Sequence, residues 1–122
     1  MSRFLTTLQT EQLGKWEHRL LADLVLEDEL GTFTAPAGFV TNFASLQVLH
    51  NALLFVLFAL VAGYGNLAAT IHDQLYTAAS MSRSDCDAVF YRALRAEGVA
   101  RWRAWIMYAG VRLGGASHYG SP

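Results

Sequence analysis

Three side chains that could do chemistry lie within one short stretch, residues 69–76, which reads A-T-I-H-D-Q-L-Y. They are His72, Asp73 and Tyr76. In a helix His72 and Tyr76 share a face and Asp73 can also reach Tyr76, so an imidazole, a carboxylate and a phenol form one polar edge. Histidine transfers protons near neutral pH, and both His and Asp bind divalent metals. The sequence therefore predicts a polar site centred on the His72-Asp73 pair.

Two further residues could complete this site. Asp87 lies near the start of a later predicted helix, so His72 and Asp87 are the candidate ligands of a divalent metal, with His72 and Asp73 as candidate catalytic groups. Ser45 is a candidate nucleophile, although it lies in no G-x-S-x-G turn. The structural alternative is that His72 or Asp73 braces the loop at residues 39–45 while Asp87 caps a helix.

The first part of the chain favours strands. Residues 15–28 alternate weakly and end in an apolar block, with a helix as the competing reading, and residues 32–35 are rich in Thr and Phe, as strands often are. A turn at residues 29–31 would join the two. Pro36 and Gly38 then break the chain, and an extended segment follows over residues 39–45.

The second half of the chain predicts helices. Asn66 is the expected N-cap of a helix that runs to about residue 79. Residues 82–87 are the clearest helix start, with Ser84 and Asp87 resembling a capping box. Gly98 is expected to end that helix, and a last helix is expected over residues 99–113.

Apolar periodicity predicts which helix faces are buried. The helix that starts near residue 82 carries a stripe at helical spacing, formed by Cys86, Val89, Phe90, Ala93 and Leu94. On the last helix the residues expected to face inward are Trp102, Ile106, Ala109 and Leu113. Its three arginines are expected nearer the periphery: Arg101, Arg103 and Arg112. The predicted class is α+β, a small N-terminal β-hairpin or sheet followed by a bundle of three to four helices.

Residues 46–64 are the most apolar segment and approach the length of a membrane span. The uninterrupted apolar run, residues 52–62, is too short to cross a bilayer, and no basic cluster flanks it closely. We therefore expect a buried helix or a subunit-contact helix, with a membrane span as the alternative.

Length and composition set further bounds. A chain of 122 residues has the length of a single domain. We expect an arm over residues 1–14, the domain over residues 15–116 and a tail over residues 117–122. The net charge of −1 gives no general case for nucleic acid. Cys86 is the single cysteine, which excludes an intrachain disulfide. The N-terminus lacks the pattern of a signal peptide.

Charge is unevenly distributed along the sequence. Residues 1–29 contain three basic and six acidic residues, whereas residues 83–122 contain six arginines and three acidic residues. This asymmetry favours two ends that attract each other or a partner. Trp102 and Trp105 with nearby arginines could also stack nucleic-acid bases, although core and rim of a helix is the preferred interpretation.

Four segments, in this order and spacing, resemble a family of phage and prophage proteins, domain-of-unknown-function family 1353. They read P-A-G-F-V-T-N-F-A-S from residue 36, A-A-T-I-H-D-Q-L-Y from residue 68, S-R-S-D-C-D-A-V-F from residue 82 and V-R-L-G-G from residue 111. The resemblance spans about residues 16–119. It implies a phage context and a shared site at Asn42, Ser45, His72, Asp73, Tyr76 and Asp87.

Two departures from the family pattern bear on activity. The family has Asp where this chain has Asn42, which keeps a hydrogen-bonding oxygen but removes a charge. Leu46 and Gln47 stand where the family usually has Ile and Pro. Both departures favour a packing role in an assembly over a catalytic centre.

These observations predict a virion or assembly protein, associated with the phage tail or tail tip, that is located in the virion or in the host cytoplasm during assembly. Its partners would be other phage proteins or further copies of itself, with no specific nucleic acid. The alternative is a small metal-dependent hydrolase directed at the cell wall, in which a divalent metal would be the cofactor. A membrane-associated lysis accessory is a lesser alternative, resting on residues 46–64.

Overall fold

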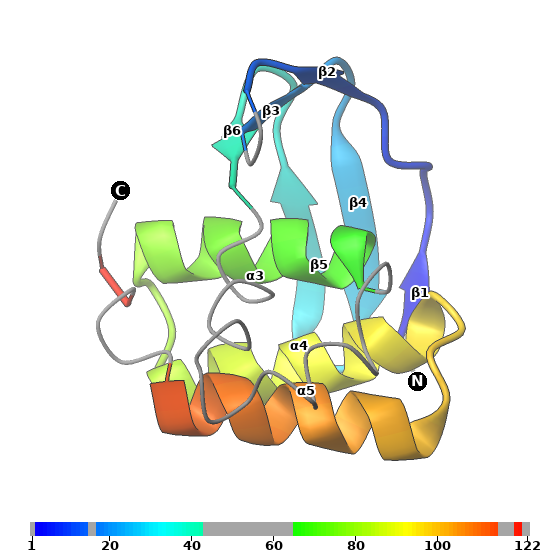
Figure 1. Cartoon of the computed structure of the whole chain (residues 1–122), viewed down its shortest axis with the longest axis vertical. Coiled ribbons are helices and arrows are strands. Elements are labelled where there is room, and N and C mark those ends of the chain that lie inside the picture. Colours follow the sequence, from blue (N-terminus) through cyan, green and yellow to red (C-terminus); the bar gives the residue numbers. More distant parts are fainter. Residues whose placement is uncertain (1, 15–16, 43–64, 115–118, 121–122) are drawn as a thin grey trace.

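The computed structural model describes residues 2–14, 17–42, 65–114 and 119–120. Within these residues, six short strands precede three helices along the chain (Figure 1). This arrangement confirms the predicted α+β class and the order of strands before helices. Ser45 and the apolar segment at residues 46–64 lie outside the described residues.

The strands form two antiparallel three-stranded sheets. One has the order β1-β4-β5, made of Arg3–Phe4, Leu24–Asp28 and Gly31–Ala35. The other has the order β2-β3-β6, made of Thr10–Gln12, His18–Leu20 and Val40–Thr41. The turn expected at residues 29–31 joins β4 to β5, with Asp28 opposite Gly31 in the register.

The structure differs from the sequence prediction at two places in the sheets. Residues 1–14 were expected to form an arm, but they supply β1 and β2. Residues 15–28 were expected to form one strand, but they contain β3 and β4, which belong to different sheets. The chain bends at residues 21–22. This bend lets Leu20 and Leu24, on its two sides, both enter the core.

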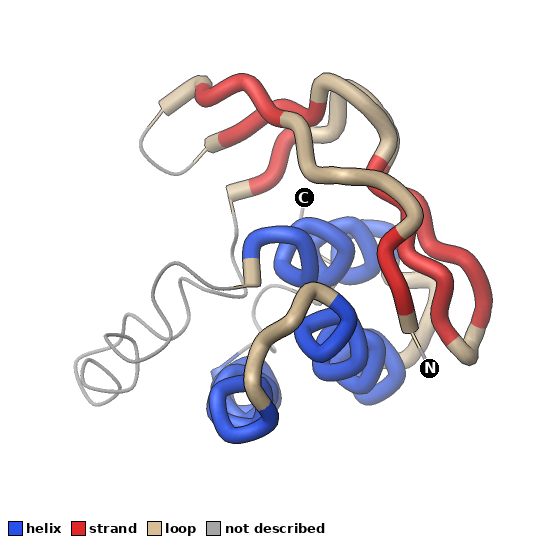
Figure 2. The backbone as a smooth tube through the Cα atoms, turned by 90° about the vertical axis from the view of Figure 1, so that its right-hand side faces the viewer, coloured by secondary structure: helices blue, strands red, loops and turns tan. Residues whose placement is uncertain are grey.

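The helices lie together on one side of the strands (Figure 2). They are α3 (Asn66–Ala78), α4 (Arg83–Ala96) and α5 (Arg101–Gly114). Helix α4 packs against both α3 and α5, and β4 and β5 pack on α3. Fully buried side chains from all of these layers meet in one core, among them Leu26, Ile71, Phe90 and Met107. Burying a side chain of this size contributes roughly 1.5–3 kcal/mol.

The start of α3 depends on a residue distant in sequence. Asn66 was predicted to be the N-cap, but it is the first helical residue and Gly65 is the N-cap, with a positive φ of 86° and no side chain to offer. The Glu97 carboxylate takes that role, because it accepts the Ala68 backbone N–H at 2.9 Å. An unpaired N–H in the first helical turn is thereby satisfied from the far end of α4.

The start of α4 was predicted at the right place but with the wrong cap. Ser82 is the N-cap, and its hydroxyl accepts the backbone N–H of Asp85 at 3.1 Å. The expected capping box of Ser84 and Asp87 is wrong, because the Asp87 side chain turns into the interior of the protein. Gly98 follows the end of α4 with a φ of 98°, as its predicted role requires.

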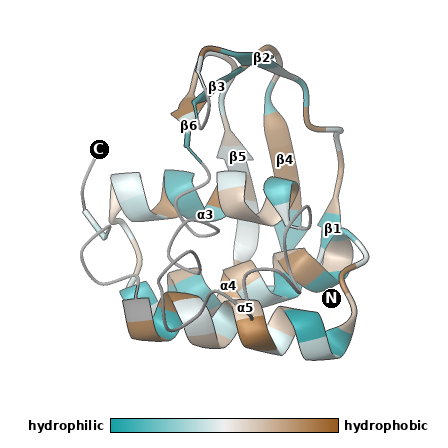
Figure 3. Cartoon of the chain, viewed as in Figure 1, coloured by the Kyte–Doolittle hydropathy of each residue, from teal (hydrophilic) through white to brown (hydrophobic). Residues whose placement is uncertain are grey.

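The predicted buried face is correct for α4 and wrong for α5. All five residues of the α4 stripe are buried. On α5 the buried hydrophobic side chains are instead Ala104, Met107 and Val111. Of the four residues predicted to face inward, Ile106 is partly buried against the core, whereas Trp102, Ala109 and Leu113 are exposed. Both faces of α5 carry apolar residues, so hydrophobic periodicity could not choose between them, and Figure 3 shows hydrophobic and hydrophilic residues interspersed along this helix. None of the described helices is long and apolar enough to cross a membrane.

Candidate functional site

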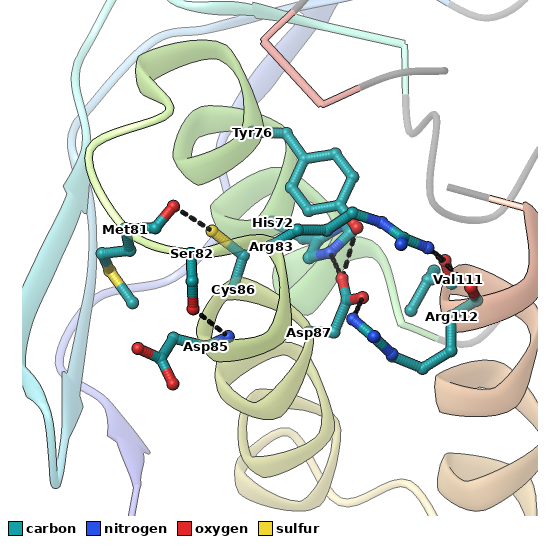
Figure 4. Close-up of polar contacts among 10 residues, drawn as sticks. All are labelled: His72, Tyr76, Met81, Ser82, Arg83, Asp85, Cys86, Asp87, Val111 and Arg112. Carbon is teal, nitrogen blue, oxygen red and sulfur yellow. Dashed lines mark hydrogen bonds and ion pairs between the residues drawn. The ribbon is translucent and has the colours of Figure 1, made fainter. Parts of the chain in front are cut away.

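Asp87 on α4 is the centre of a buried polar cluster (Figure 4). His72 Nε2 lies 2.6 Å from carboxylate oxygen Oδ1, and the Tyr76 hydroxyl donates to the same oxygen. Arg112 donates to the other oxygen, Oδ2, at 2.8 Å. His72 and Tyr76 come from α3 and Arg112 from α5, so this Asp87 cluster joins three helices.

The cluster is closed to solvent apart from its arginine. The exposed fraction is 0% for Asp87, 2% for His72 and 4% for Tyr76. The His72 ring packs between two aromatic rings, with centroids 4.0 Å from Tyr76 and 4.8 Å from Phe90. A buried carboxylate without partners would be very unfavourable, so the three donors are what allow the charge of Asp87 to lie here.

The pKa shifts follow from these contacts. Burial alone would raise the pKa of Asp87, but the hydrogen bonds from His72 and Tyr76 outweigh it and hold that pKa below its ordinary value. Burial and the hydrogen bond to Asp87 raise the pKa of Tyr76 well above its ordinary value. At neutral pH Asp87 is therefore an acceptor and Tyr76 a fixed donor.

Arg83 fastens the end of α5 beside this cluster. Its guanidinium donates to the backbone carbonyls of Val111 at 3.1 Å and Arg112 at 2.6 Å. These carbonyls belong to the last turn of α5, where a cation is favourable. Because the contact holds that turn against α4, it also holds the Arg112 side chain within reach of Asp87.

The structure separates the His72-Asp73 pair on which the sequence prediction was centred. His72 points to Asp87, whereas Asp73 is half-buried and accepts a hydrogen bond from the Thr41 hydroxyl at the end of β6. Neighbouring helical residues point about 100° apart, which is why the two side chains meet different partners. Asn42 follows Thr41 directly and is exposed, at the same junction of β6 and α3.

The contacts made by His72 bear on the predicted metal site. The two candidate ligands, His72 and Asp87, are hydrogen-bonded to each other, so a metal bound by both would have to displace this contact. In the part of the chain that the structure describes, no group of three or more His, Cys, Asp or Glu side chains gathers closely enough to hold a metal. The metal-ligand assignment stays a prediction.

Sequence reasoning missed the two arginines of the site. Arg112 was expected at the periphery, because the periodicity of α5 predicted the opposite face as buried. One signal could have found it, since Arg112 belongs to the V-R-L-G-G segment that the family resemblance had already marked. Arg83 gave no such signal, because its partners are backbone carbonyls.

A second buried carboxylate lies between sheet and helix. Arg92 of α4 donates two hydrogen bonds to Asp28 of β4, at 2.9 and 3.0 Å, and Ser2 also donates to Asp28. Burial would raise the pKa of Asp28, but the bonds from Arg92 and Ser2 lower it further than burial raises it. This paired geometry is among the strongest that side chains make.

The comparisons with known proteins identify the family. The model described as "Protein of unknown function (DUF1353)" matches residues 18–111, which include all of α3 and α4 and most of α5. The α+β domain with its buried Asp87 cluster therefore belongs to this family. A search of curated proteins and a search of solved structures each found no match.

Proposed function

We propose that this chain is a structural component of a bacteriophage particle or of its assembly, associated with the tail or tail tip. The phage setting comes from the sequence resemblance described above. The observation that carries the structural role is the Asp87 cluster, in which Asp87, His72 and Tyr76 are closed to solvent and bonded to one another. Catalytic acids, bases and metal ligands must reach a substrate, whereas these groups stabilise the contact between helices.

Two other carboxylates also support a structural role, because each forms a hydrogen bond between two elements of the fold. Asp28 links β4 to α4 through Arg92. Asp73 links α3 to β6 through Thr41. Polar contacts placed at successive junctions of the fold give a domain of defined shape, which suits a subunit that must fit its neighbours.

Mass spectrometry of purified particles tests this proposal. Particles from an infected or induced culture that encodes the chain are banded twice in a density gradient and washed in high salt. We expect peptides of the chain at a constant ratio to a tail protein, while a non-structural phage protein serves as the control and is removed. Absence from washed particles, together with normal tails after deletion of the coding sequence, would contradict the proposal.

The alternative function, a metal-dependent hydrolase, predicts different results from the structural role. Protein purified without chelator is measured for metal content and for its ability to clear a suspension of isolated cell wall. We expect neither a stoichiometric metal nor clearing, because His72 Nε2 is already bonded to Asp87. A stoichiometric metal that is lost in His72→Ala, with the fold retained, would favour the hydrolase instead.

A further inference from the structure

An apolar row of side chains runs along the outer side of α5. Trp102, Trp105 and Leu113 are 49%, 57% and 82% exposed, and Ala109, which lies between Trp105 and Leu113 along the helix, is also exposed. Residues three and four positions apart lie on the same side of a helix, so these four form one row opposite the buried side chains of α5. The row contains no charged side chain. We call it the outer row of α5.

Arginines flank the outer row on both sides. Because successive helical residues point about 100° apart, Arg101 and Arg112 lie on one flank and Arg103 on the other. Arg103 extends over the Trp102 ring, with its guanidinium carbon 4.3 Å from the ring centroid. Helix α5 contains no acidic residue. Long arginine side chains in such positions cover apolar surface with their stems while the charged group stays in a polar layer.

The turn between α4 and α5 adds positive charge at the start of the outer row. Arg101 is exposed, and so is Arg95 near the end of α4, whose guanidinium donates to a backbone carbonyl. In the described residues neither of these two arginines forms an ion pair. The nearby carboxylate of Glu97 is directed to the start of α3 instead. Arg112 differs, because it is paired with Asp87.

Helix α5 lies at the edge of the molecule. In Figure 1 it is the helix farthest from β2 and β3, and its main contact is with α4. The outer row points away from that contact, so it can meet a flat surface. An apolar row flanked by arginines is the pattern with which a helix lies in the plane of a membrane surface. Tryptophan favours the boundary between headgroups and acyl chains, and arginine is attracted to anionic lipids.

The outer row fits nucleic acid or a second copy of the chain less well. Base stacking uses the free face of an aromatic ring, and Arg103 already covers one face of Trp102. Trp105 packs against Tyr91 of α4, with ring centroids 5.0 Å apart. Leu113, the most exposed member of the row, offers neither a ring nor a charge to a nucleotide. Two copies that met through their outer rows would bring their arginine flanks together, which is unfavourable.

We propose that the outer row of α5 binds the surface of a phospholipid bilayer that contains anionic lipids. Trp102, Trp105 and Leu113 enter the boundary between headgroups and acyl chains, while Arg101 and Arg103 contact headgroup phosphates. This inference goes beyond the proposed function, because it adds a membrane surface as the partner of residues that do not belong to the Asp87 cluster.

Co-flotation with vesicles tests the membrane contact. The intact protein is mixed with vesicles of phosphatidylcholine, alone or with about 30% phosphatidylglycerol, at about 0.05 M and about 0.5 M salt. We expect binding to the anionic vesicles at low salt, with tryptophan emission shifted to shorter wavelength. Binding to neutral vesicles, or at high salt, is about tenfold weaker or worse, because the charge attraction is absent or screened. Protein that does not float with anionic vesicles at low salt, or that binds both lipid compositions equally, overturns the proposal.

Two variants of exposed residues locate the contact. Leu113→Ser removes the most exposed apolar side chain of the outer row, and Arg101→Glu reverses a flanking charge. Because both side chains are exposed, we expect the fold to be retained, which circular dichroism checks. Binding to anionic vesicles falls about fivefold in Leu113→Ser and about tenfold or more in Arg101→Glu.

Leu21→Ser and Arg19→Glu are the matched controls, and both bind vesicles like wild type. Both residues are exposed in or directly after β3, which Figure 1 places at the end of the molecule opposite α5. If the controls weaken binding as much as the α5 variants do, or if none of the four variants weakens it, the contact lies elsewhere and the proposal is overturned. Binding to single-stranded DNA or to polyglutamate without binding to vesicles also overturns it. Detection of the chain in washed particles depends on no lipid, so failure of this inference is distinguishable from failure of the proposed function.

Discussion

Asp87 carries a negative charge with no exposed surface, and its three donors come from two helices other than its own. The hydrogen bonds to such a buried carboxylate add little net stability to the fold, because transferring its charge out of water is itself unfavourable. What matters is that every donor is in place. Loss of one partner leaves a buried charge or a buried donor unmatched, at a carboxylate that has no exposed surface.

Asp87→Asn tests this dependence. The amide presents an N–H₂ group to donors that need an acceptor, so we expect the free energy of unfolding to fall by about 3–5 kcal/mol, as for a broken buried ion pair. Urea titration followed by circular dichroism measures it. Asp85→Asn is the matched control, because Asp85 is exposed on the same helix and should cost less than about 1 kcal/mol. Equal losses in the two variants would show that Asp87 has no special role.

The pKa shifts predict the direction of acid sensitivity. Asp87 and Asp28 have pKa values in the folded protein below the ordinary 3.8, so their stabilisation is complete above about pH 4 and is lost as pH falls through their folded values. Burial raises the pKa of Glu97 above 4.5, so its contribution has the opposite sign and is lost as pH rises through its folded value. Urea midpoints between about pH 2.5 and 6 should fall on the acid side in wild type, and fall less steeply in Asp87→Asn. A parallel loss in both proteins would assign the acid sensitivity elsewhere.

Sequence reasoning found part of the site at this scale. The sequence predicts His72, Tyr76 and Asp87 as site residues, and the structure brings them together. Their contacts could not be derived from spacing, because Asp87 meets His72 only after α3 and α4 pack. The same holds for Asp73, whose partner Thr41 lies in a strand far away in sequence.

Among the helices, the start of α3 and the end of α5 are satisfied by side chains from the two ends of α4. Glu97, just past the end of α4, satisfies the start of α3, and Arg83, at the start of α4, satisfies the end of α5. The ends of the three helices are therefore coupled, and α4 is the element on which the others depend. The start of α4 itself relies on a local cap, Ser82.

Ser82→Ala and Ser84→Ala separate the observed cap from the cap that the sequence suggested. Removing the Ser82 hydroxyl leaves the Asp85 N–H without its acceptor, and we expect a loss of about 1 kcal/mol in unfolding free energy. Ser84→Ala removes an exposed hydroxyl and should change stability by less than about 0.5 kcal/mol. Thermal or urea unfolding of the two variants side by side measures the difference. A larger loss of unfolding free energy in Ser84→Ala than in Ser82→Ala would instead support the predicted capping box of Ser84 and Asp87.

Helices α4 and α5 differ in whether hydrophobic periodicity predicts the buried face. The α4 stripe is flanked by charged and polar residues, so one face alone could be buried, and that face was predicted correctly. Helix α5 offers large apolar residues outside and small or flexible ones inside, such as Ala104 and Met107. Because both faces of α5 carry apolar residues, periodicity alone could not identify the face that packs on α4.

At the scale of the whole molecule, the two sheets are unequally buried. In the sheet of β1, β4 and β5, alternate residues of β4 enter the core, including Leu24 and Leu26. In the sheet of β2, β3 and β6, the buried residues are Leu20 and Thr41. The second sheet therefore has less hydrophobic stabilisation and is the part expected to open first.

Amide hydrogen exchange followed by mass spectrometry tests this order. We expect β2 and β3 to exchange under native conditions well before β4, because their backbone hydrogen bonds lie near solvent and few buried side chains hold them. Helix α4 should be the most protected, since α3, α5 and the sheet all contact it. If β2 and β4 exchange at the same rate, the two sheets open as one unit.

The position of Cys86 has a practical consequence for studying this fold. Its side chain is fully buried on α4, and burial raises its pKa to about 11, so the thiol is both shielded and protonated at neutral pH. A thiol reagent can then modify it only during the moments when α4 separates from its neighbours. Because the chain has one cysteine, the rate of modification reports the frequency of that opening without any engineered label. In the native protein, the rate of thiol modification at Cys86 therefore measures how often the helical core opens.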